Sequence, residues 1–346
     1  MKYREVGATG VRVSEIGFGG GGNAGLMVRG TAKEQQSAIG RALDLGINYF
    51  DQAPDYGDGI SETNLGHALK TFGAHPIITT KVEVRSQDLD DIAGHIERSV
   101  DASLHRLQID CVDFLQIHNG PLMTRPALSG RSYRHLSLED YLRPGGGLDG
   151  LQRVQHAGKA RFIGIVTRGN DGAAARQLID TGCLSLINVS INLLNPSASI
   201  RPQGMRVGQD FDEILGYAAA HRVGTAIYSP LAGGLLTDQA VGGGAPHPLA
   251  RELAGPDARG AGLQQARAFR FLSRELDPAA QTDDHNLTEA AIRFVLSREG
   301  VTVVLGGFSD ARQVEQAADC AAKGPLSNVN MTRIEDVWRA NFLLEL

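Results

Sequence analysis

Short apolar stretches alternate with longer amphipathic ones along most of the chain, and this alternation predicts repeated β-strand and α-helix units. The first 15 residues differ, because apolar and polar residues alternate on both sides of a glycine-containing turn and so predict a β-hairpin. Eight further strands are expected at Glu15 to Gly19, Ile47 to Asp51, Ile77 to Val82, Val112 to His118, Arg161 to Thr167, Ser185 to Ile191, Thr225 to Ser229 and Val301 to Leu305.

Helical patterns separate these strands. They span Ala32 to Leu45, Ser61 to Lys70, Asp88 to Leu107, Leu138 to His156, Gly172 to Thr181, Asp212 to Arg222, Leu287 to Arg298 and Asp310 to Ala322. Alternation of this kind predicts an α/β protein, a closed parallel (β/α)8 TIM barrel that forms a single domain over residues 1–346. The N-terminal β-hairpin is expected to plug one mouth of the barrel.

Two connections are too long to be simple turns. Residues 119–137 and residues 231–284 are expected to form long loops over the C-terminal face, where loops of barrels usually cover ligands. Residues 331–343 have helical spacing and are expected to pack outside the barrel, with Trp338 as a packing residue.

Composition narrows the classes of partner. The formal net charge is -5 and the pI is about 6.1, which argues against a nucleic-acid partner and favours a small molecule. The N-terminus has no apolar signal region and no run is long enough to span a bilayer, so no membrane partner and a cytoplasmic location are expected. Three widely spaced cysteines favour neither a disulfide framework nor a metal site.

Four ionisable side chains lie at or just beyond the ends of three consecutive predicted strands: Asp51, Tyr56, Lys81 and His118. Each has an ordinary structural explanation when taken alone, such as a helix cap, a packing residue or a solvated strand end. Parallel strands of a barrel, however, open at one face, which is where barrels place their catalytic groups. The coincidence therefore predicts an active site at that mouth.

The chain resembles the aldo-keto reductase superfamily over nearly its whole length. The motifs that carry the resemblance are Tyr3 to Ser14, Gly46 to Asp51, Tyr56-Gly57, Ser61-Glu62, Leu65-Gly66, Lys81, Asp113 to His118, Tyr228 to Leu231 and Val301 to Gly307. The resemblance implies carbonyl reduction with a nicotinamide dinucleotide, or oxidation of the corresponding alcohol or aldose. It places the catalytic tetrad on Asp51, Tyr56, Lys81 and His118.

The chemistry of the tetrad supports this assignment. Reduction needs a hydride at carbon and a proton at oxygen, and an isolated tyrosine with a pKa of about 10 is a poor donor near neutrality. Lys81 beside the phenol is expected to lower that pKa, with Asp51 holding the ammonium in place. Tyr56 is then the general acid, and His118 is expected to donate a hydrogen bond to the substrate oxygen or to help relay the proton.

The resemblance also implies a set of cofactor contacts. They fall on Gly20, Thr167, Arg168, Asn188, Tyr228, Ser229, Leu231, Gly233, Gly307, Ser309, Arg312, Glu315 and Gln316. Tyr228 is expected to stack on the nicotinamide ring, while Thr167-Arg168 stands where the family has a Ser-Asn pair, so Arg168 is a departure. Arg312 favours NADP through the 2′-phosphate, but Asp310 opposes it and NAD is possible.

Two other patterns in the sequence have a functional interpretation. Gly17-Phe-Gly-Gly-Gly-Gly22 matches a dinucleotide-binding fingerprint, but no helix follows directly, so close backbone approach to a ligand at the mouth is the preferred interpretation. Arg125, Arg131, Arg134 and His135 in the first long loop fit either an anionic substrate or a solvated loop face about equally.

Two rival functions remain. Some relatives of this fold are nicotinamide-sensing regulatory subunits, and slow or absent turnover would be compatible with the same residues. A Schiff-base enzyme with Lys81 as nucleophile is the other, although Asp51 disfavours it by keeping the amine charged.

Overall fold

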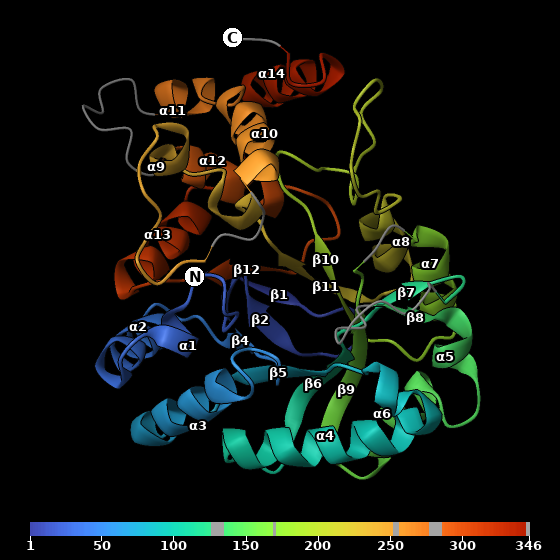
Figure 1. The fold of residues 1–346 in the computed structure, drawn as a ribbon. Coiled ribbons are helices and arrows are strands. Elements are labelled where there is room, and N and C mark those ends of the chain that lie inside the picture. The colour runs from blue at the N-terminus through green and yellow to red at the C-terminus, as the bar shows by residue number, and fades with distance from the viewer. Residues whose placement is uncertain (126–134, 169–170, 252–255, 277–285, 344–346) are drawn as a thin grey trace.

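The computed structural model describes residues 1–125, 135–168, 171–251, 256–276 and 286–343. Eight parallel strands close into a barrel in the order β10-β11-β12-β3-β4-β5-β6-β9, and helices surround it (Figure 1). The barrel strands are β3 (Ile16–Gly19), β4 (Tyr49–Asp51), β5 (Ile77–Val82), β6 (Val112–Ile117), β9 (Ala160–Val166), β10 (Leu186–Ser190), β11 (Gly224–Tyr228) and β12 (Val303–Gly307). The predicted TIM barrel is confirmed.

Most of the surrounding helices lie where the apolar periodicity predicted them. They are α2 (Ala32–Asp44), α3 (Ile60–Phe72), α4 (Ile92–Leu107), α7 (Gly172–Asp180), α8 (Ile214–Ala220), α12 (Asn286–Leu296) and α13 (Ala311–Ala322), with η1 (Ser86–Asp91) ahead of α4. Local chemistry explains where several of them begin. Thr31 and Glu34 form a reciprocal capping box at α2, and the side chains of Asp91 and Asp310 cap α4 and α13.

One predicted helix is wrong as a single element. Residues 138–156 form two helices, α5 (Leu138–Leu142) and α6 (Gly147–His156). Arg143 precedes Pro144 and is extended, with ψ of 153°, and Gly145 has a φ of 73°. A residue before proline avoids the helical conformation, and a positive φ suits glycine, so the chain turns between the two helices.

The two long connections contain short elements of their own. The first holds β7 (Gly120–Leu122) and β8 (His135–Ser137), which pair in parallel. The second holds η2 (Ala232–Gly234), α9 (Asp238–Val241), α10 (Pro256–Arg267) and α11 (Phe271–Leu276). Helix α1 (Leu26–Arg29) follows β3, and α14 (Asn328–Arg339) lies outside the barrel. Among the described residues, no helix is both long and apolar enough to cross a bilayer.

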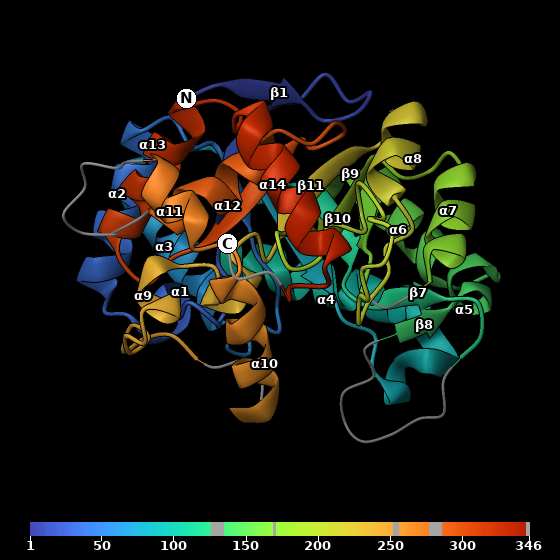
Figure 2. The same ribbon diagram turned by 90° about the horizontal axis from the view of Figure 1, so that it is seen from above.

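The hairpin β1 (Tyr3–Glu5) and β2 (Arg12–Ser14) closes one end of the barrel. Val6, Val11 and Val13 are buried in a cluster with Tyr49 and Phe114 from the barrel strands. Figure 2 shows β1 at the end opposite to α10 and the β7–β8 pair. The predicted plug is confirmed, and the other end, where the strands finish, is left for the site.

Trp338 on α14 is fully buried, and its indole nitrogen donates to the carbonyl of Leu193 at 2.8 Å. Its ring also meets Phe294 edge to face. The expectation that Trp338 is a packing residue is confirmed.

Candidate active site

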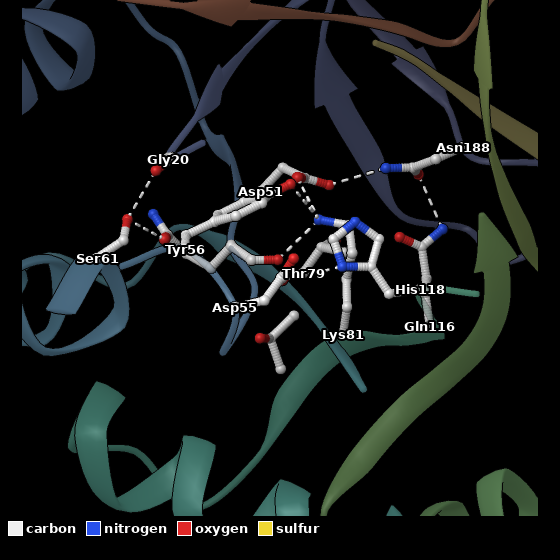
Figure 3. Close-up of polar contacts among 12 residues, drawn as sticks. Gly20, Asp51, Asp55, Tyr56, Ser61, Thr79, Lys81, Gln116, His118 and Asn188 are labelled. Carbon is white, nitrogen blue, oxygen red and sulfur yellow. Dashed lines mark hydrogen bonds and ion pairs between the residues drawn. The ribbon is translucent and has the colours of Figure 1, made fainter. Parts of the chain in front are cut away.

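Lys81 lies at the centre of a polar cluster inside the open end of the barrel (Figure 3). Its ammonium donates to a carboxylate oxygen of Asp51 and, at 2.7 Å, to the carbonyl of Gln52, and it lies 3.4 Å from the Tyr56 hydroxyl. The side chains of Lys81 and Asp51 are only 2% and 3% exposed. The neighbouring strands β4 and β5 therefore bring three of the four predicted residues into contact.

The pKa values of this group differ from the expectation for Tyr56. Burial raises the pKa of Tyr56 above its ordinary value of 10.0 and outweighs the charge of Lys81, which acts to lower it. Burial alone would lower the pKa of Lys81, but the charge of Asp51 and the contact with Tyr56 outweigh it, so that pKa is raised. The phenol is therefore protonated and the amine charged near neutral pH.

His118 completes the cluster from the end of β6. Its Nδ1 lies 3.0 Å from a carboxylate oxygen of Asp55, its Nε2 contacts the guanidinium of Arg168, and its ring meets Tyr56 edge to face at 5.9 Å. Burial lowers the pKa of His118 to about 4, more than Asp55 raises it. Burial would raise the pKa of Asp55, but the hydrogen bond with His118 and the nearby cations lower it instead.

Two further polar side chains extend this network across the barrel. The amide of Asn188 donates to Asp51 Oδ2 at 3.0 Å, and Gln116 donates to Asn188 Oδ1 at 2.8 Å (Figure 3). All three side chains are buried. Asn188, which the resemblance assigned to the cofactor, thus uses its amide inside the barrel. Gln116 was missed, although its position two residues before His118 puts both side chains on one face of the strand.

Glycines leave the mouth beside β3 and β12 without side chains. The ends of these strands pair at Gly307 and Gly19. A side chain at Gly20 would collide with Gln52, whereas one at Gly21 would point toward the ring of Tyr56, whose Cζ lies 3.8 Å from the ideal Cβ position. Gly21 therefore keeps the space over Tyr56 open, as a flat ligand there would require.

Ser61 holds this glycine segment in place. Its hydroxyl lies 2.9 Å from the carbonyl of Gly20 and 2.6 Å from Gln52 Oε1. The Nε2 atom of Gln52 is buried and has no hydrogen-bond partner. An unpaired buried donor at the mouth is consistent with a polar ligand in this space.

The other predicted cofactor contacts lie on strands that follow one another around the mouth. Thr167 and Arg168 follow β9, Tyr228 ends β11 with Ser229, Leu231 and Gly233 beyond it, and Gly307 ends β12 ahead of α13. The tetrad lies at the ends of β4, β5 and β6, on the remaining part of the ring. The two predicted groups therefore divide one mouth between them.

Near the candidate nicotinamide end, Tyr228 and Thr167 are in contact. The Tyr228 hydroxyl donates to the Thr167 carbonyl at 3.4 Å, and burial raises the pKa of Tyr228 to about 12. Ser229 has a φ of 54°, and its carbonyl accepts from the Asn192 amide at 3.0 Å. These bonds fix the turn that leaves β11.

The contacts that the resemblance assigns to the adenosine end of the cofactor lie on helix α13 or just before it, namely Ser309, Arg312, Glu315 and Gln316. The Ser309 hydroxyl donates to the Ala24 carbonyl at 2.7 Å, which joins the β12 end to the glycine segment. Glu315 forms an ion pair with Arg41 at 2.6 Å.

Of the arginines in the first long loop, the structure describes Arg125. Arg125 pairs with Asp140, a fully buried carboxylate that also bonds Ser137. Arg131 and Arg134 lie outside the described residues, and His135 begins β8. The substrate interpretation of these arginines remains a hypothesis.

Comparison with known proteins agrees with the fold and identifies the family. The model of the aldo/keto reductase family matches residues 15–339, so the chain belongs to that family. It is an NAD(P)-dependent oxidoreductase of a family that acts on small carbonyl compounds.

Three known proteins are similar to this chain. L-galactose dehydrogenase of Arabidopsis thaliana is 27% identical over 96% of this chain and 91% of its own length. A putative voltage-gated potassium channel subunit beta of Schizosaccharomyces pombe is 29% identical over 68% of this chain and 64% of its own. An aldo-keto reductase of Bacillus halodurans, solved in a holo form, has the same fold with a TM-score of 0.70, 22% identity and coverage of 98% and 97%.

Proposed function

We propose that the protein reduces an aldehyde or ketone, or oxidises the corresponding alcohol or aldose, with Tyr56 as the general acid and base. One observation carries the proposal, namely the chain of contacts from the Tyr56 hydroxyl to Lys81 and on to buried Asp51. A proton donor coupled to a fixed cation at the open end of a barrel suits proton transfer to a carbonyl oxygen.

The residues at the mouth fit an extended nicotinamide dinucleotide. Bound NAD(P)H would supply the hydride, which adds to the carbonyl carbon. Tyr228 and Thr167 would hold the ring end, the bare backbone from Gly20 to Gly22 would accept close approach, and Ser309 with Arg312 would hold the adenosine end. The proton then passes from the Tyr56 hydroxyl to the substrate oxygen, and Lys81 stabilises the phenolate that remains.

The test is a panel of aldehydes, ketones and aldoses assayed by cofactor absorbance, with Tyr56→Phe as the variant. Because the phenol supplies a proton only during reaction, Tyr56→Phe should lower kcat by about 100-fold or more while cofactor Kd changes less than twofold. A Tyr56→Phe variant that retained more than about a tenth of the wild-type rate would remove Tyr56 from the donor role.

The second candidate is a nicotinamide-binding regulatory subunit with slow or no turnover. The similarity to a protein named as a potassium channel subunit supports this second candidate. The same assay separates the two functions, because a regulatory subunit would bind the cofactor in a fluorescence titration yet oxidise it slowly or not at all with every carbonyl in the panel.

A further inference from the structure

Both ring nitrogens of His118 are occupied. Arginine can only donate hydrogen bonds, so the contact of Arg168 with Nε2 requires a lone pair on that nitrogen. The remaining proton of the neutral ring is then on Nδ1, which donates to Asp55 at 3.0 Å. His118 in this arrangement has no N–H to offer a substrate, contrary to the role that the resemblance gave it.

Arg168 is held next to His118 by its backbone. An ideal Cβ at Gly120 would lie 1.4 Å from the Arg168 carbonyl, so the loop that leaves β6 and the end of β9 touch backbone to backbone. The preceding residue, Thr167, is fixed by the bond from its amide to the Asn188 carbonyl at 2.8 Å. Only glycine permits this approach, which brings the guanidinium across to the end of β6.

The charge of Arg168 acts on the groups around the reaction space. It lowers the pKa of both Tyr56 and Tyr228, although burial dominates in each case. A cation that influences the candidate proton donor and the candidate ring-stacking residue lies near the place where the carbonyl must sit. Arg168 is also only partly buried.

We propose that Arg168, in place of His118, donates the hydrogen bond to the reacting oxygen of the substrate, and that Asp55 and His118 position its guanidinium. The inference rests on the proposed reductase function. As the hydride bonds to the carbonyl carbon, the π electrons move to the oxygen, and the Tyr56 proton forms the new O–H bond. Arg168 keeps all its protons and stabilises the developing negative charge, while the Tyr56 phenolate is reprotonated from solvent.

The first experiment compares Arg168→Met with Arg161→Met, a control at the opposite end of the same strand, where Arg161 pairs with Asp113. Arg168→Met should lower kcat by about 100- to 1,000-fold, as for a lost oxyanion donor, with cofactor Kd within about twofold. Guanidinium ion added to the Arg168→Ala variant should raise its kcat at least about tenfold. The Arg161→Met variant should have the kcat and the cofactor Kd of the wild type.

Opposite results would overturn the proposal. A loss in kcat smaller than about threefold would remove Arg168 from catalysis. A cofactor Kd that rises by tenfold or more in Arg168→Met, with kcat unchanged at saturating cofactor, would make Arg168 a cofactor-binding residue, as the resemblance implies.

The second experiment begins with a measurement that needs no turnover. In protein carrying 15N-labelled histidine, long-range 1H–15N spectra should show His118 as a neutral ring with its proton on Nδ1. Asp55→Asn should change that tautomer pattern and lower kcat by about tenfold with little change in KM. Finding the proton on Nε2 in the wild type would overturn the inference.

The two experiments also separate failure of the inference from failure of the function. A wild type that shows the Nδ1 proton but reduces no carbonyl would overturn the proposed function, and with it the catalytic role of Arg168. A wild type that reduces carbonyls but carries its proton on Nε2 would overturn the inference alone.

Discussion

Asp51 and Lys81 neutralise each other in a site that excludes water, and this pairing has opposite consequences for stability and for catalysis. Removing one charge leaves the other buried without a partner, which costs more than losing both together. Proton donation by the Tyr56 phenol, in contrast, needs the Lys81 ammonium whether or not the Asp51 carboxylate is charged. Stability and turnover should therefore respond differently to single and double substitution.

Lys81→Met should lower the free energy of unfolding by about 3 to 5 kcal/mol, because Asp51 is left as an unpaired buried charge. The double variant Lys81→Met/Asp51→Asn should recover more than half of that loss. Neither variant should regain turnover, since both lack the cation beside Tyr56. Urea unfolding and single-turnover assays measure the two effects, and a double variant that works at the wild-type rate would make the pair purely structural.

The same residues predict a flat pH profile for reduction. Tyr56 acts as an acid in its protonated form, and its raised pKa means that this form is lost only as pH rises above 10.0. The pKa of Lys81 is raised above 10.5, and that of His118 is about 4, so neither titrates near neutrality. The single-turnover rate of reduction should vary less than about twofold between roughly pH 6 and 9. A steep limb near pH 7 in stopped-flow measurements would contradict this assignment.

At the scale of elements, apolar periodicity was sufficient to predict the strands and helices that follow a repeated pattern. The strand that ends just before His118 and the helix at 311–322 follow from apolar spacing, and parallel strand ends in a barrel must share a mouth. The break between α5 and α6 was also written in the sequence, as Pro144 and three glycines, but the apolar spacing on either side concealed it.

The contacts of Arg168 and Asp55 could not be predicted from the sequence patterns. Each depends on how two loops meet, and the approach of Gly120 to the Arg168 carbonyl is set by tertiary packing that no local spacing records. Asp55 stood beside Tyr56 in the sequence without a role, because only the fold shows that it faces His118. Long-range side-chain contacts of this kind are the part that sequence reasoning misses.

Helix α13 offers a test of cofactor choice. Arg312→Ala should weaken NADPH binding by about 1 to 3 kcal/mol and leave NADH binding nearly unchanged, if its guanidinium holds the 2′-phosphate. Fluorescence titration with both cofactors measures this. Equal losses for NADPH and NADH would instead place Arg312 on the adenine or pyrophosphate.

Asp310→Asn should shift preference the other way, towards NADPH, because it removes a negative charge beside the same phosphate. Asp310 caps α13 through the amide of Gln313 at 2.9 Å, and asparagine caps helices as well as aspartate does. The helix should therefore remain intact, and thermal unfolding provides the control. No change in the NADPH to NADH ratio would show that the carboxylate is remote from the cofactor.

In the molecule as a whole, the candidate active site and the hairpin that closes the barrel lie at opposite ends. The candidate site lies where the parallel strands end, and the hairpin seals the opposite end with an apolar cluster. Arg4 ties that hairpin to the barrel through Glu15 at 2.7 Å and through the carbonyls of Val301 at 2.7 Å and Leu296 at 3.0 Å. The Glu15 side chain is only 8% exposed, so it depends on this partner.

Arg4→Ala should therefore lower the free energy of unfolding by about 2 kcal/mol, less than for a fully buried pair because Arg4 is itself 30% exposed. Arg12→Ala, on the same hairpin, is the matched control, since its guanidinium contacts the Tyr3 carbonyl at 3.4 Å. Turnover per folded molecule at 25 °C should stay near the wild-type value in both variants, because the site is at the far end of the barrel. Urea unfolding and kcat measured together test this, and a fall in kcat without a loss of stability in Arg4→Ala would mean that the two ends are coupled.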